Sequence, residues 1–330
     1  MKLGWPVELA GTGLYVPERV VTNEDFMRRL DTSDEWIVQR TGIHERRIIG
    51  PDDSTLTMAT EACKAALADA GITPEDVDLI ICGTITPEYI LPSTACLLQD
   101  TLGCRWVPAF DLSAACSGYV WSFLTGAQYI ASGMARNVLV VGAETLTAIT
   151  DMEDRATAIL FGDGAGAAVL RAATDPQRGI LAARQGADGK RGMLINIPAG
   201  GARHPASEKT VAERMHYMRM RGREVYKFAV TQMHEIIHET AADAGVSVAD
   251  LALVVPHQSN LRIIESACER AGVPAERVLV NIDRYGNTSA ASVGIALHEA
   301  RRDGRIKSGD LVMLVAFGAG LTWGSVLMRV

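Results

Sequence analysis

The feature that most constrains the fold is an internal repeat. Residues 68–81 (ADAGITPEDVDLII) match residues 242–255 (ADAGVSVADLALVV) at a shift of 174 positions, with six identities. The shift persists, because the apolar run 138–142 corresponds to 312–316. A helix that ends at glycine before a strand can recur by chance, but the length and persistence of this match favour duplication. We therefore expect two similar halves, 1–172 and 173–330.

Short apolar runs alternate with helical patterns along the chain. Strands are predicted at 77–85, 138–142, 167–170, 251–256, 278–282 and 311–317. Helices are predicted at 56–70, 117–132, 225–244, 260–271 and 291–302. This alternation is typical of an α/β protein in which helices cover a central sheet.

Composition excludes several classes of protein. The net charge is −7, whereas nucleic-acid-binding proteins usually carry a basic excess. No apolar run approaches the ~20 residues that span a membrane, and the first six residues, MKLGWP, lack the apolar core of a secretion signal. The six cysteines have no CxxC spacing, so we expect them to be reduced. These patterns predict a cytoplasmic protein that binds neither nucleic acid nor membrane.

One cysteine has the surroundings of a nucleophile. Cys116 lies among small residues between a strand-like run and a helix-like run. The start of a helix favours the thiolate form, and the small neighbours leave room for a substrate carbonyl. A buried structural cysteine is nevertheless the commoner role of a Cys in an apolar segment. This stretch alone leaves both interpretations open.

The repeat adds two residues to the candidate site. At the shift of 174, Cys116 corresponds to Ala290, which closely follows Asn287, and His257 follows the second copy of the repeated strand. Two similar halves packed around a pseudo-two-fold axis bring equivalent loops face to face. We therefore expect Cys116, His257 and Asn287 to lie close together. Taken alone, His257 is more typical of a core histidine and Asn287 of a turn residue.

A thiol, an imidazole and a carboxamide form a coherent catalytic set. The thiol of Cys116 can attack a thioester and carry the acyl group. The side chains of His257 and Asn287 can donate hydrogen bonds to a developing enolate oxygen, and such charge stabilisation is often the largest catalytic effect. A carboxylate in their place would repel the enolate. The set therefore predicts acyl transfer and enolate chemistry rather than hydrolysis.

Four longer motifs extend this pattern over nearly the whole chain. They read DLSAACSG at 111–118, VPHQSNLR at 255–262, YGNTSA at 285–290 and AFGAGLTWG at 316–324. Together they resemble the β-ketoacyl-acyl-carrier-protein synthase III family, whose members start fatty-acid synthesis. The resemblance implies the α/β thiolase-like fold, in which duplicated halves pack as five αβαβα layers. It also implies a homodimer that needs no cofactor besides its thioester substrates.

The resemblance implies a role for each catalytic residue. In that family the cysteine accepts an acyl group from acyl-CoA, and the histidine and asparagine support decarboxylation of malonyl-acyl-carrier protein. Cys116 is then the nucleophile, while His257 and Asn287 hold the malonyl thioester oxygen. The backbone N–H groups of Cys116 and Ala319 form the oxyanion hole. The expected primer is a short acyl-CoA such as acetyl-CoA, and the products are 3-oxoacyl-acyl-carrier protein, CoA and CO2.

The same resemblance implies a tunnel for the CoA arm. The residues that it assigns to CoA and pantetheine are Thr32, Trp36, Arg40, Arg155 and Asn260. Trp36 and Arg155 are expected to flank the adenine, because an indole face and a guanidinium can sandwich a base. Arg262 is expected to meet the acidic surface of the acyl carrier protein.

Two positions depart from the family's pattern. The C-terminal turn usually reads FGGGF, whereas here it reads FGAGL at 317–321. The oxyanion hole therefore requires a backbone conformation at Ala319 that suits a residue with a Cβ. Leu91 stands where an aromatic side chain often closes the acyl pocket across the dimer interface. Leu91 and Phe317 are the predicted acyl-pocket residues, and the length and branching of the primer stay open.

Three other segments have simpler interpretations. The run HEIIH at 234–238 matches the zinc-protease signature, but the repeat aligns its histidines with Thr60 and Lys64, which we expect to be solvated, and no third ligand follows. We predict no metal site. The glycine-rich run 161–167 precedes a strand, so it favours close backbone packing over phosphate binding. Residues 186–223 are predicted to form a long surface excursion, either a flap at the tunnel or a solvated loop.

Two other functions remain as alternatives. A thiolase-fold acyltransferase or condensing enzyme of secondary metabolism would keep the fold and change the acceptor. Glu88 would then be the candidate base, although its simplest interpretation is a polar turn residue after Pro87. A non-catalytic thiolase-fold binding protein is disfavoured by the intact Cys116, His257 and Asn287.

Overall fold

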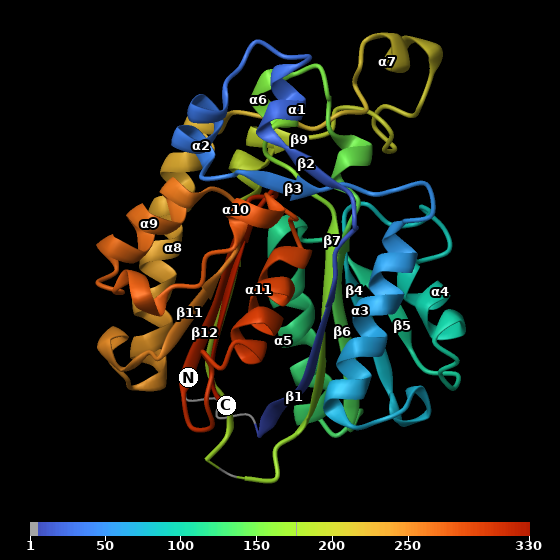
Figure 1. The fold of residues 1–330 in the computed structure, drawn as a ribbon. Helices are drawn as coiled ribbons and strands as arrows, with labels where there is room; N and C mark the ends of the chain where they lie inside the picture. The colour runs from blue at the N-terminus through green and yellow to red at the C-terminus, as the bar shows by residue number, and fades with distance from the viewer. Residues whose placement is uncertain (1–5, 176) are drawn as a thin grey trace.

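Two sheets form the frame of the molecule (Figure 1). The computed structural model describes residues 6–175 and 177–330, so the segment 1–5, on which the expectation of no secretion signal rests, lies outside it. The first sheet contains, in spatial order, β1 (Val7–Tyr15), β7 (Gly164–Ala172), β6 (Asn137–Glu144), β4 (Leu79–Gly83) and β5 (Ala109–Leu112). The second contains β11 (Leu253–Pro256), β12 (Leu311–Gly318), β13 (Thr322–Arg329) and β8 (Gly179–Ala187).

The two sheets repeat one register. In the first sheet β4 runs parallel to β6, with Leu79 opposite Val138. In the second sheet β11 runs parallel to β12, with Leu253 opposite Val312. Both residues of the second pair follow those of the first by 174 positions, as the sequence repeat does. In each half the chain continues into an antiparallel neighbour, β7 or β13. The boundaries drawn between the halves at 172 and 173 stay a prediction.

Helices form three layers that alternate with the sheets (Figure 1). The outer helices are α3 (Thr55–Ala70) and α4 (Thr94–Thr101) on the first sheet, and α8 (Gly222–Ala244) and α9 (Leu261–Arg270) on the second. The central layer consists of α5 (Gly118–Ala131) and α11 (Ala291–Arg302). Phe123 of α5 and Leu297 of α11 are buried in one core with side chains from both sheets. This arrangement confirms the five-layer thiolase-like fold.

Shorter elements surround this frame within the described residues. The other helices are α1 (Asn23–Met27), α2 (Asp34–Thr41), α6 (Arg155–Ala158), α7 (Glu208–Ala212) and α10 (Ile282–Tyr285). Two further strand pairs join β2 (Val20–Thr22) to β3 (Glu45–Arg47), and β9 (Ile195–Asn196) to β10 (Arg219–Met220). The predicted excursion 186–223 carries β9, α7 and β10, and α7 stands apart at the top of Figure 1. Met218 of this excursion is buried, so the segment is not simply solvated.

The predicted helices agree with the structure to within a few residues. They appear as α3, α5, α8, α9 and α11. α3 and α8 both end at a glycine with left-handed backbone, Gly71 with φ 68° and Gly245 with φ 71°. Glycine adopts this conformation without the steric cost that a Cβ brings. The shared ADAG sequence therefore marks the same helix end in both halves.

The predicted strands are less accurate. The strand at 278–282 is wrong, because Val278 makes only an isolated bridge with Val254 and α10 begins at Ile282. β1, β8 and β13 were not predicted. β1 contains Gly13, where an added Cβ would lie 2.1 Å from the carbonyl oxygen of Ala62 on α3. Such glycines permit close helix packing, but they weaken the pattern by which a strand is identified.

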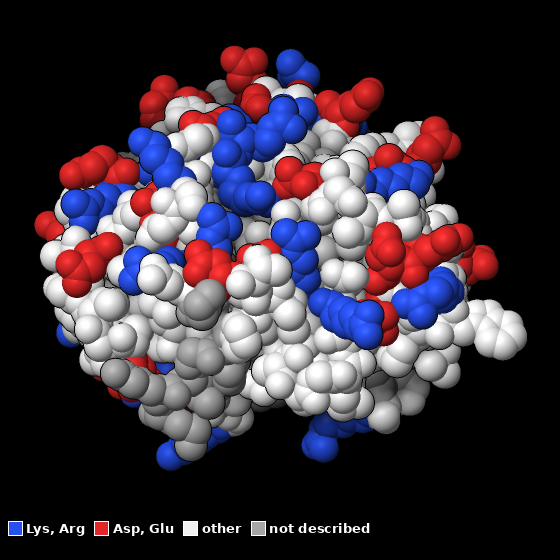
Figure 2. Space-filling model, turned by 90° about the horizontal axis from the view of Figure 1, so that it is seen from below, with Lys and Arg blue, Asp and Glu red and all other residues white. Residues whose placement is uncertain are grey.

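Charged side chains on the surface are paired locally. Figure 2 shows acidic and basic groups interspersed on the face at the lower end of Figure 1. Ion pairs include Arg171 with Glu8 at 2.7 Å and Arg184 with Asp243 at 2.6 Å. Within the described part of the chain, the helices are too short or too polar to cross a membrane.

Candidate active site

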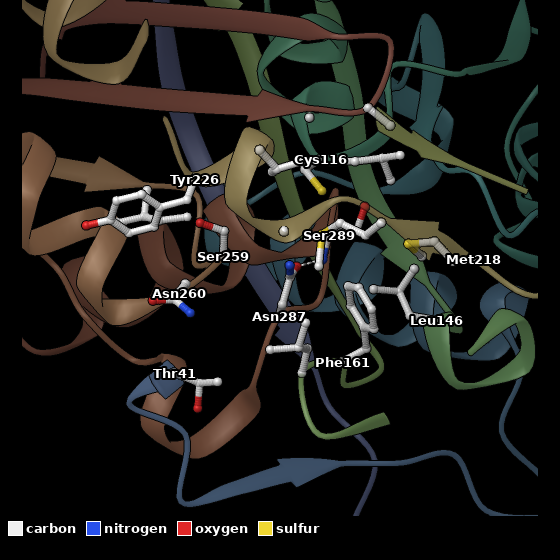
Figure 3. Close-up of a pocket in the computed structure, with 18 of the residues that line it drawn as sticks. Thr41, Cys116, Leu146, Phe161, Met218, Tyr226, Ser259, Asn260, Asn287 and Ser289 are labelled. Atoms are coloured by element: carbon white, nitrogen blue, oxygen red, sulfur yellow. Dashed lines mark hydrogen bonds between the residues drawn. The ribbon is translucent and has the colours of Figure 1, made fainter. Parts of the chain in front are cut away.

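A cavity of about 440 Å³ gathers most of the predicted site residues (Figure 3). Those that line it are Trp36, Arg40, Cys116, Arg155, His257, Asn260, Asn287, Phe317 and Ala319. They come from both halves of the chain. The structure therefore brings the thiol, the imidazole and the carboxamide to one place, as the repeat predicts.

Cys116 lies on a sharp turn between β5 and α5. The turn is a 3₁₀ segment, Ala115–Ser117, and Ala115 has a left-handed φ of 46°. Such a conformation is costly for a residue with a Cβ. Ser289, 174 positions later, has the same φ of 46° before α11. The two halves thus share one strained turn, which presents Cys116 in the first half and Ala290 in the second.

The Cys116 thiol is protonated at neutral pH. Burial raises its pKa to about 12, which outweighs a hydrogen bond with the Ser289 hydroxyl that lowers it, and the charge of Glu144 raises it further. The expectation that the helix start favours the thiolate is therefore opposed by burial. Attack on a thioester requires a group that removes the thiol proton.

His257 follows β11, and one of its ring nitrogens is hydrogen-bonded to Ser292. Its Nδ1 lies 2.6 Å from Ser292 Oγ, and the Gln258 N–H donates to that same oxygen at 3.4 Å. Because Ser292 accepts from Gln258, its own hydrogen is free to point to Nδ1 of the imidazole. The neutral ring then carries its proton on Nε2. Burial lowers the pKa of His257 to about 3, so the ring is a neutral hydrogen-bond donor.

We expect the buried imidazole of His257 to weaken the fold in acid. The unfolded chain protonates it near the ordinary pKa of about 6.5, whereas the folded chain does so only near pH 3. As the pH falls below 6.5, the unfolded state binds the proton first, so the free energy of unfolding decreases. Between pH 7 and pH 4, His257→Gln should lose about 3 kcal/mol less of this free energy than the unmutated protein. Urea denaturation measures the difference, and equal losses would contradict it.

Asn287 is fixed by its backbone and by its own side chain. Its N–H donates to Leu160 O at 2.9 Å, and its carbonyl accepts from Gly162 N at 3.0 Å. Its side-chain Oδ1 accepts from Ser289 N at 2.8 Å. The amide NH2 is therefore the group that Asn287 can present to a ligand. Figure 3 shows the sulfur of Cys116 pointing towards Ser289 and Asn287.

The turn that carries Ala319 lies directly against the nucleophile. A Cβ added to Gly318 would lie 2.7 Å from Cys116 N, so glycine is needed there. The Thr322 hydroxyl lies 3.1 Å from the carbonyl oxygens of both Ala114 and Ala319 and ties the two turns together. Positive φ occurs at Gly320, at 137°, and not at Ala319. The alanine therefore fits without strain, and its N–H can serve the predicted oxyanion hole.

At the cavity entrance, Trp36 contacts two arginines. The Arg155 guanidinium lies 5.0 Å from the centre of a Trp36 ring, and that of Arg40 lies 5.3 Å from it. Both are cation–π contacts, so guanidinium groups already pack against the indole that a base would use. An adenine can enter between Trp36 and Arg155 only if Arg155 moves. Asn260 caps α9 by accepting from Arg262 N at 3.0 Å and donates to Arg40 O at 2.9 Å.

Among the described residues, three that are predicted for the site do not line the cavity. They are Thr32, Leu91 and Arg262. Arg262 is exposed in the first turn of α9, beside Asn260. Leu91 is 85% exposed. Glu88, the base of the alternative function, accepts from Leu56 N at 2.9 Å at the start of α3. That contact agrees with its interpretation as a structural residue.

Sequence analysis missed several residues of the site. Leu146, Phe161 and Met218 form an apolar wall on one side of Cys116, whereas Thr41 and Asn260 lie on the other (Figure 3). Ser292 orients His257. Glu144 and Ser289 lie behind the thiol and are hydrogen-bonded to each other. A serine in the run GNTS gives no indication of a catalytic role by itself. Ser289 can still be found from the sequence, because it is the repeat equivalent of Ala115.

The HEIIH run at 234–238 and the glycine-rich run at 161–167 have structural explanations. His234 and His238 are adjacent on α8, with ring centres 5.0 Å apart. Among the described residues, no group of three or more His, Cys, Asp or Glu side chains is placed to hold a metal ion. In the glycine-rich run, a Cβ on Gly162 would lie 2.2 Å from Tyr285 O, and one on Gly166 would lie 2.4 Å from Ile295 N. These glycines therefore permit close packing of the two halves.

Comparisons with known proteins agree with this site and fold. The family described as 3-Oxoacyl-[acyl-carrier-protein (ACP)] synthase III matches residues 110–189, and its C-terminal counterpart matches residues 241–330. The chain is 50% identical over 324 residues to the β-ketoacyl-[acyl-carrier-protein] synthase III of Symbiobacterium thermophilum, with 98% of each covered. The crystal structure of 3-oxoacyl-[acyl-carrier-protein] synthase III from Aquifex aeolicus has a TM-score of 0.91 and 48% identity, covering 98% of this chain and 100% of that one.

A priming β-ketosynthase from the R1128 polyketide biosynthetic pathway is also similar. It has a TM-score of 0.90 and 35% identity, covering 98% of this chain and 96% of its own. The Symbiobacterium and Aquifex synthases match at higher identity over a similar share of the chain. The chain belongs to the β-ketoacyl-[acyl-carrier-protein] synthase III family of acyltransferases.

Proposed function

We propose that the protein condenses a short acyl-CoA with malonyl-acyl-carrier protein, through an acyl group carried on Cys116. One observation carries the proposal. A single cavity holds a thiol, an imidazole that donates from Nε2, and a carboxamide that donates from its NH2 group. The carboxylate of Glu144 is not part of its lining. This set suits a reaction in which negative charge develops on a thioester oxygen.

In the first step Cys116 accepts the acyl group. Its sulfur attacks the thioester carbonyl, and the N–H groups of Cys116 and Ala319 hold the resulting oxyanion. CoA leaves as the carbonyl re-forms on Cys116. The entrance residues Trp36, Arg40 and Arg155 are the groups that we assign to the CoA nucleotide, and Asn260 is assigned to its pantetheine arm.

In the second step malonyl-acyl-carrier protein replaces CoA in the cavity. Loss of CO2 leaves an enolate whose oxygen accepts hydrogen bonds from His257 and Asn287. Its carbon attacks the acyl group on Cys116, and the Cys116 thiolate leaves and takes up a proton, which restores the thiol. The products are 3-oxoacyl-acyl-carrier protein and free enzyme. Hydrogen-bond donors of the chain hold the charge in each step, so we propose no cofactor beyond the thioester substrates.

We propose that the primer is short, with acetyl-CoA as its simplest form. The apolar wall of Leu146, Phe161 and Met218 lies across Cys116 from the entrance side (Figure 3), and it suits a small acyl group. We further propose a homodimer. Ile90 and Leu91 are both 85% exposed on one loop, and a partner subunit would cover them. In the dimer Leu91 would close the acyl pocket of the partner.

Arg262 is the residue that we propose for contact with the acyl carrier protein. It is exposed on the first turn of α9, next to Asn260 at the cavity. A positive charge beside the entrance would attract an acidic carrier protein without contributing to the chemistry. We place the reaction in the cytoplasm, where both substrates would be available to the enzyme.

Loading by a panel of acyl-CoAs tests this proposal. Purified protein is incubated with straight and branched acyl-CoAs of increasing length and digested, and the acylated peptide is identified by mass spectrometry. We expect acetyl to load most rapidly and to be confined to Cys116. Malonyl-acyl-carrier protein should then remove the acyl group with release of CO2. Loading of a different cysteine, such as the exposed Cys96, would contradict the assignment.

A further inference from the structure

A buried carboxyl group lies behind the nucleophile, and the proposed reaction does not yet use it. Glu144 ends β6 and is fully buried. Its Oε2 accepts from Thr86 Oγ1 at 2.6 Å, from Ile85 N at 3.1 Å, from Thr86 N at 3.2 Å and from Thr84 Oγ1 at 3.2 Å. Four donors fix this oxygen, so the position of the carboxyl group is well determined.

The other oxygen of Glu144 connects to the thiol. Ser289 Oγ donates to Glu144 Oε1 at 3.0 Å. The same hydroxyl lines the cavity, and the Cys116 sulfur points towards it (Figure 3). A hydroxyl can accept one proton while it donates another. Ser289 therefore stands between the Cys116 sulfur and the Glu144 carboxylate, to which its hydroxyl is hydrogen-bonded.

In the tautomer that donates to the enolate, His257 does not remove the thiol proton. Its Nδ1 is occupied by Ser292, and its Nε2 carries the hydrogen that the enolate requires. The thiol still has to lose its proton during attack, because burial favours its neutral form. The acceptor must therefore be another group that reaches Cys116.

We propose that Glu144 accepts the Cys116 thiol proton through Ser289 during acyl transfer. As the new C–S bond forms, the thiol proton moves to Ser289 Oγ and the Ser289 hydroxyl proton moves to Glu144 Oε1. When the tetrahedral intermediate collapses, the C–S bond to CoA breaks and its electron pair stays on the CoA sulfur. That thiolate leaves with a proton from solvent, and Glu144 releases its own proton to solvent. Glu144 acts through Ser289, so it is a positioning residue.

The charge around Glu144 suits this transfer. The titratable groups that face it are the thiols of Cys82 on β4 and of Cys116, and its other neighbours are the hydroxyls and amides of residues 84–86 and Ser289. Proton transfer moves one negative charge from Glu144 towards the sulfur and adds no second negative charge to the site. Burial raises the pKa of Glu144 to about 7 against the hydrogen bonds that lower it. The carboxylate can therefore gain and lose a proton near neutral pH.

Two variants test this path for the proton, and both preserve local geometry. Glu144→Gln keeps the shape of the side chain and removes its titration. Ser289→Ala removes the hydroxyl, and alanine tolerates this backbone because Ala115 adopts the same φ of 46°. We expect each variant to slow acetyl loading of Cys116 by about a hundredfold. In the unmutated enzyme, the rate of acetyl loading should rise as the pH increases through about 7. This rise should disappear in both variants. Glu144→Asp, which keeps a titrating carboxyl group, should restore part of this rise.

The readouts separate proton transfer from a structural effect. Quenched-flow mass spectrometry measures loading of the Cys116 peptide from pH 5.5 to 9, and CO2 release from malonyl-acyl-carrier protein reports His257 and Asn287. Asp163→Asn is the matched control, because Asp163 is also buried and its carboxylate accepts from Thr147 Oγ1 at 2.6 Å. We expect this control to keep the pH profile of the unmutated enzyme.

The outcomes distinguish this inference from the proposed function on which it rests. An unmutated enzyme that never loads Cys116 would overturn both. An enzyme that loads normally, with unchanged rates and pH profiles in Glu144→Gln and Ser289→Ala, would overturn only the role of Glu144. Loss of loading and CO2 release together in both variants would also overturn it, because a purely structural effect would then be sufficient.

Discussion

Cys116→Ala is expected to abolish acyl transfer and to leave part of the malonyl decarboxylation. The variant has no sulfur to carry the acyl group, so condensation should fall at least about 10⁴-fold, as for other enzymes that lose their nucleophile. The donors of His257 and Asn287 remain, and they stabilise the enolate without the thiol. Radiolabelled acetyl-CoA measures the first partial reaction, and CO2 release from malonyl-acyl-carrier protein measures the second.

Cys96→Ala is the matched control for this variant. Cys96 is exposed on α4, so its loss should leave both partial reactions unchanged. Condensation by Cys116→Ala at the unmutated rate would remove Cys116 from the mechanism.

His257→Ala and Asn287→Ala are expected to show the opposite pattern. Each should still load an acyl group on Cys116, but decarboxylation should fall by about a hundredfold or more, since each loses a donor to the enolate oxygen. Asn287→Asp is the sharper variant. Its carboxylate still accepts from Ser289 N, as Asn287 Oδ1 does at 2.8 Å, but it places a negative charge beside the enolate. We expect it to decarboxylate no faster than Asn287→Ala.

Separate assays of the two half-reactions check this pattern. Acyl loading is followed on the Cys116 peptide, and decarboxylation is followed by CO2 release. Normal decarboxylation in both alanine variants would exclude the roles given to His257 and Asn287. Met220→Ala is a suitable control, because Met220 lines the same cavity without a hydrogen-bonding side chain.

Much of the fold could be predicted from the sequence because duplication repeats its signals. The helices carry a clear periodicity, and the shared ADAG fixes the ends of α3 and α8. β1 was missed because Gly11 and Gly13, which let the strand lie against α3, are poor indicators of a strand. The segment 278–282 (VLVNI) is apolar and rich in β-branched residues, but only one isolated bridge forms there. Pairing depends on tertiary contacts that local composition does not record.

The site was predictable only where residue type implies chemistry. A lone Cys, His and Asn in equivalent loops indicate a catalytic set, and the cavity contains all three. Glu144 reads as the last residue of an apolar strand, and nothing near it in sequence places it behind Cys116. Its partner Ser289 is 145 residues away. The contact between Trp36 and Arg155 likewise depends on side-chain conformations that a motif cannot specify.

The strained turns at Ala115 and Ser289 show how a symmetric frame yields a single active site. The shift that relates these turns also relates Glu144 to Gly318. The turn of the first half presents the reactive sulfur, and Gly318 at the strand end of the second half makes room for its amide. The turn of the second half presents a hydroxyl, and Glu144 at the equivalent strand end of the first half supplies a carboxylate. Each half is therefore the complement of the other, and catalysis depends on the positions at which the two copies have diverged.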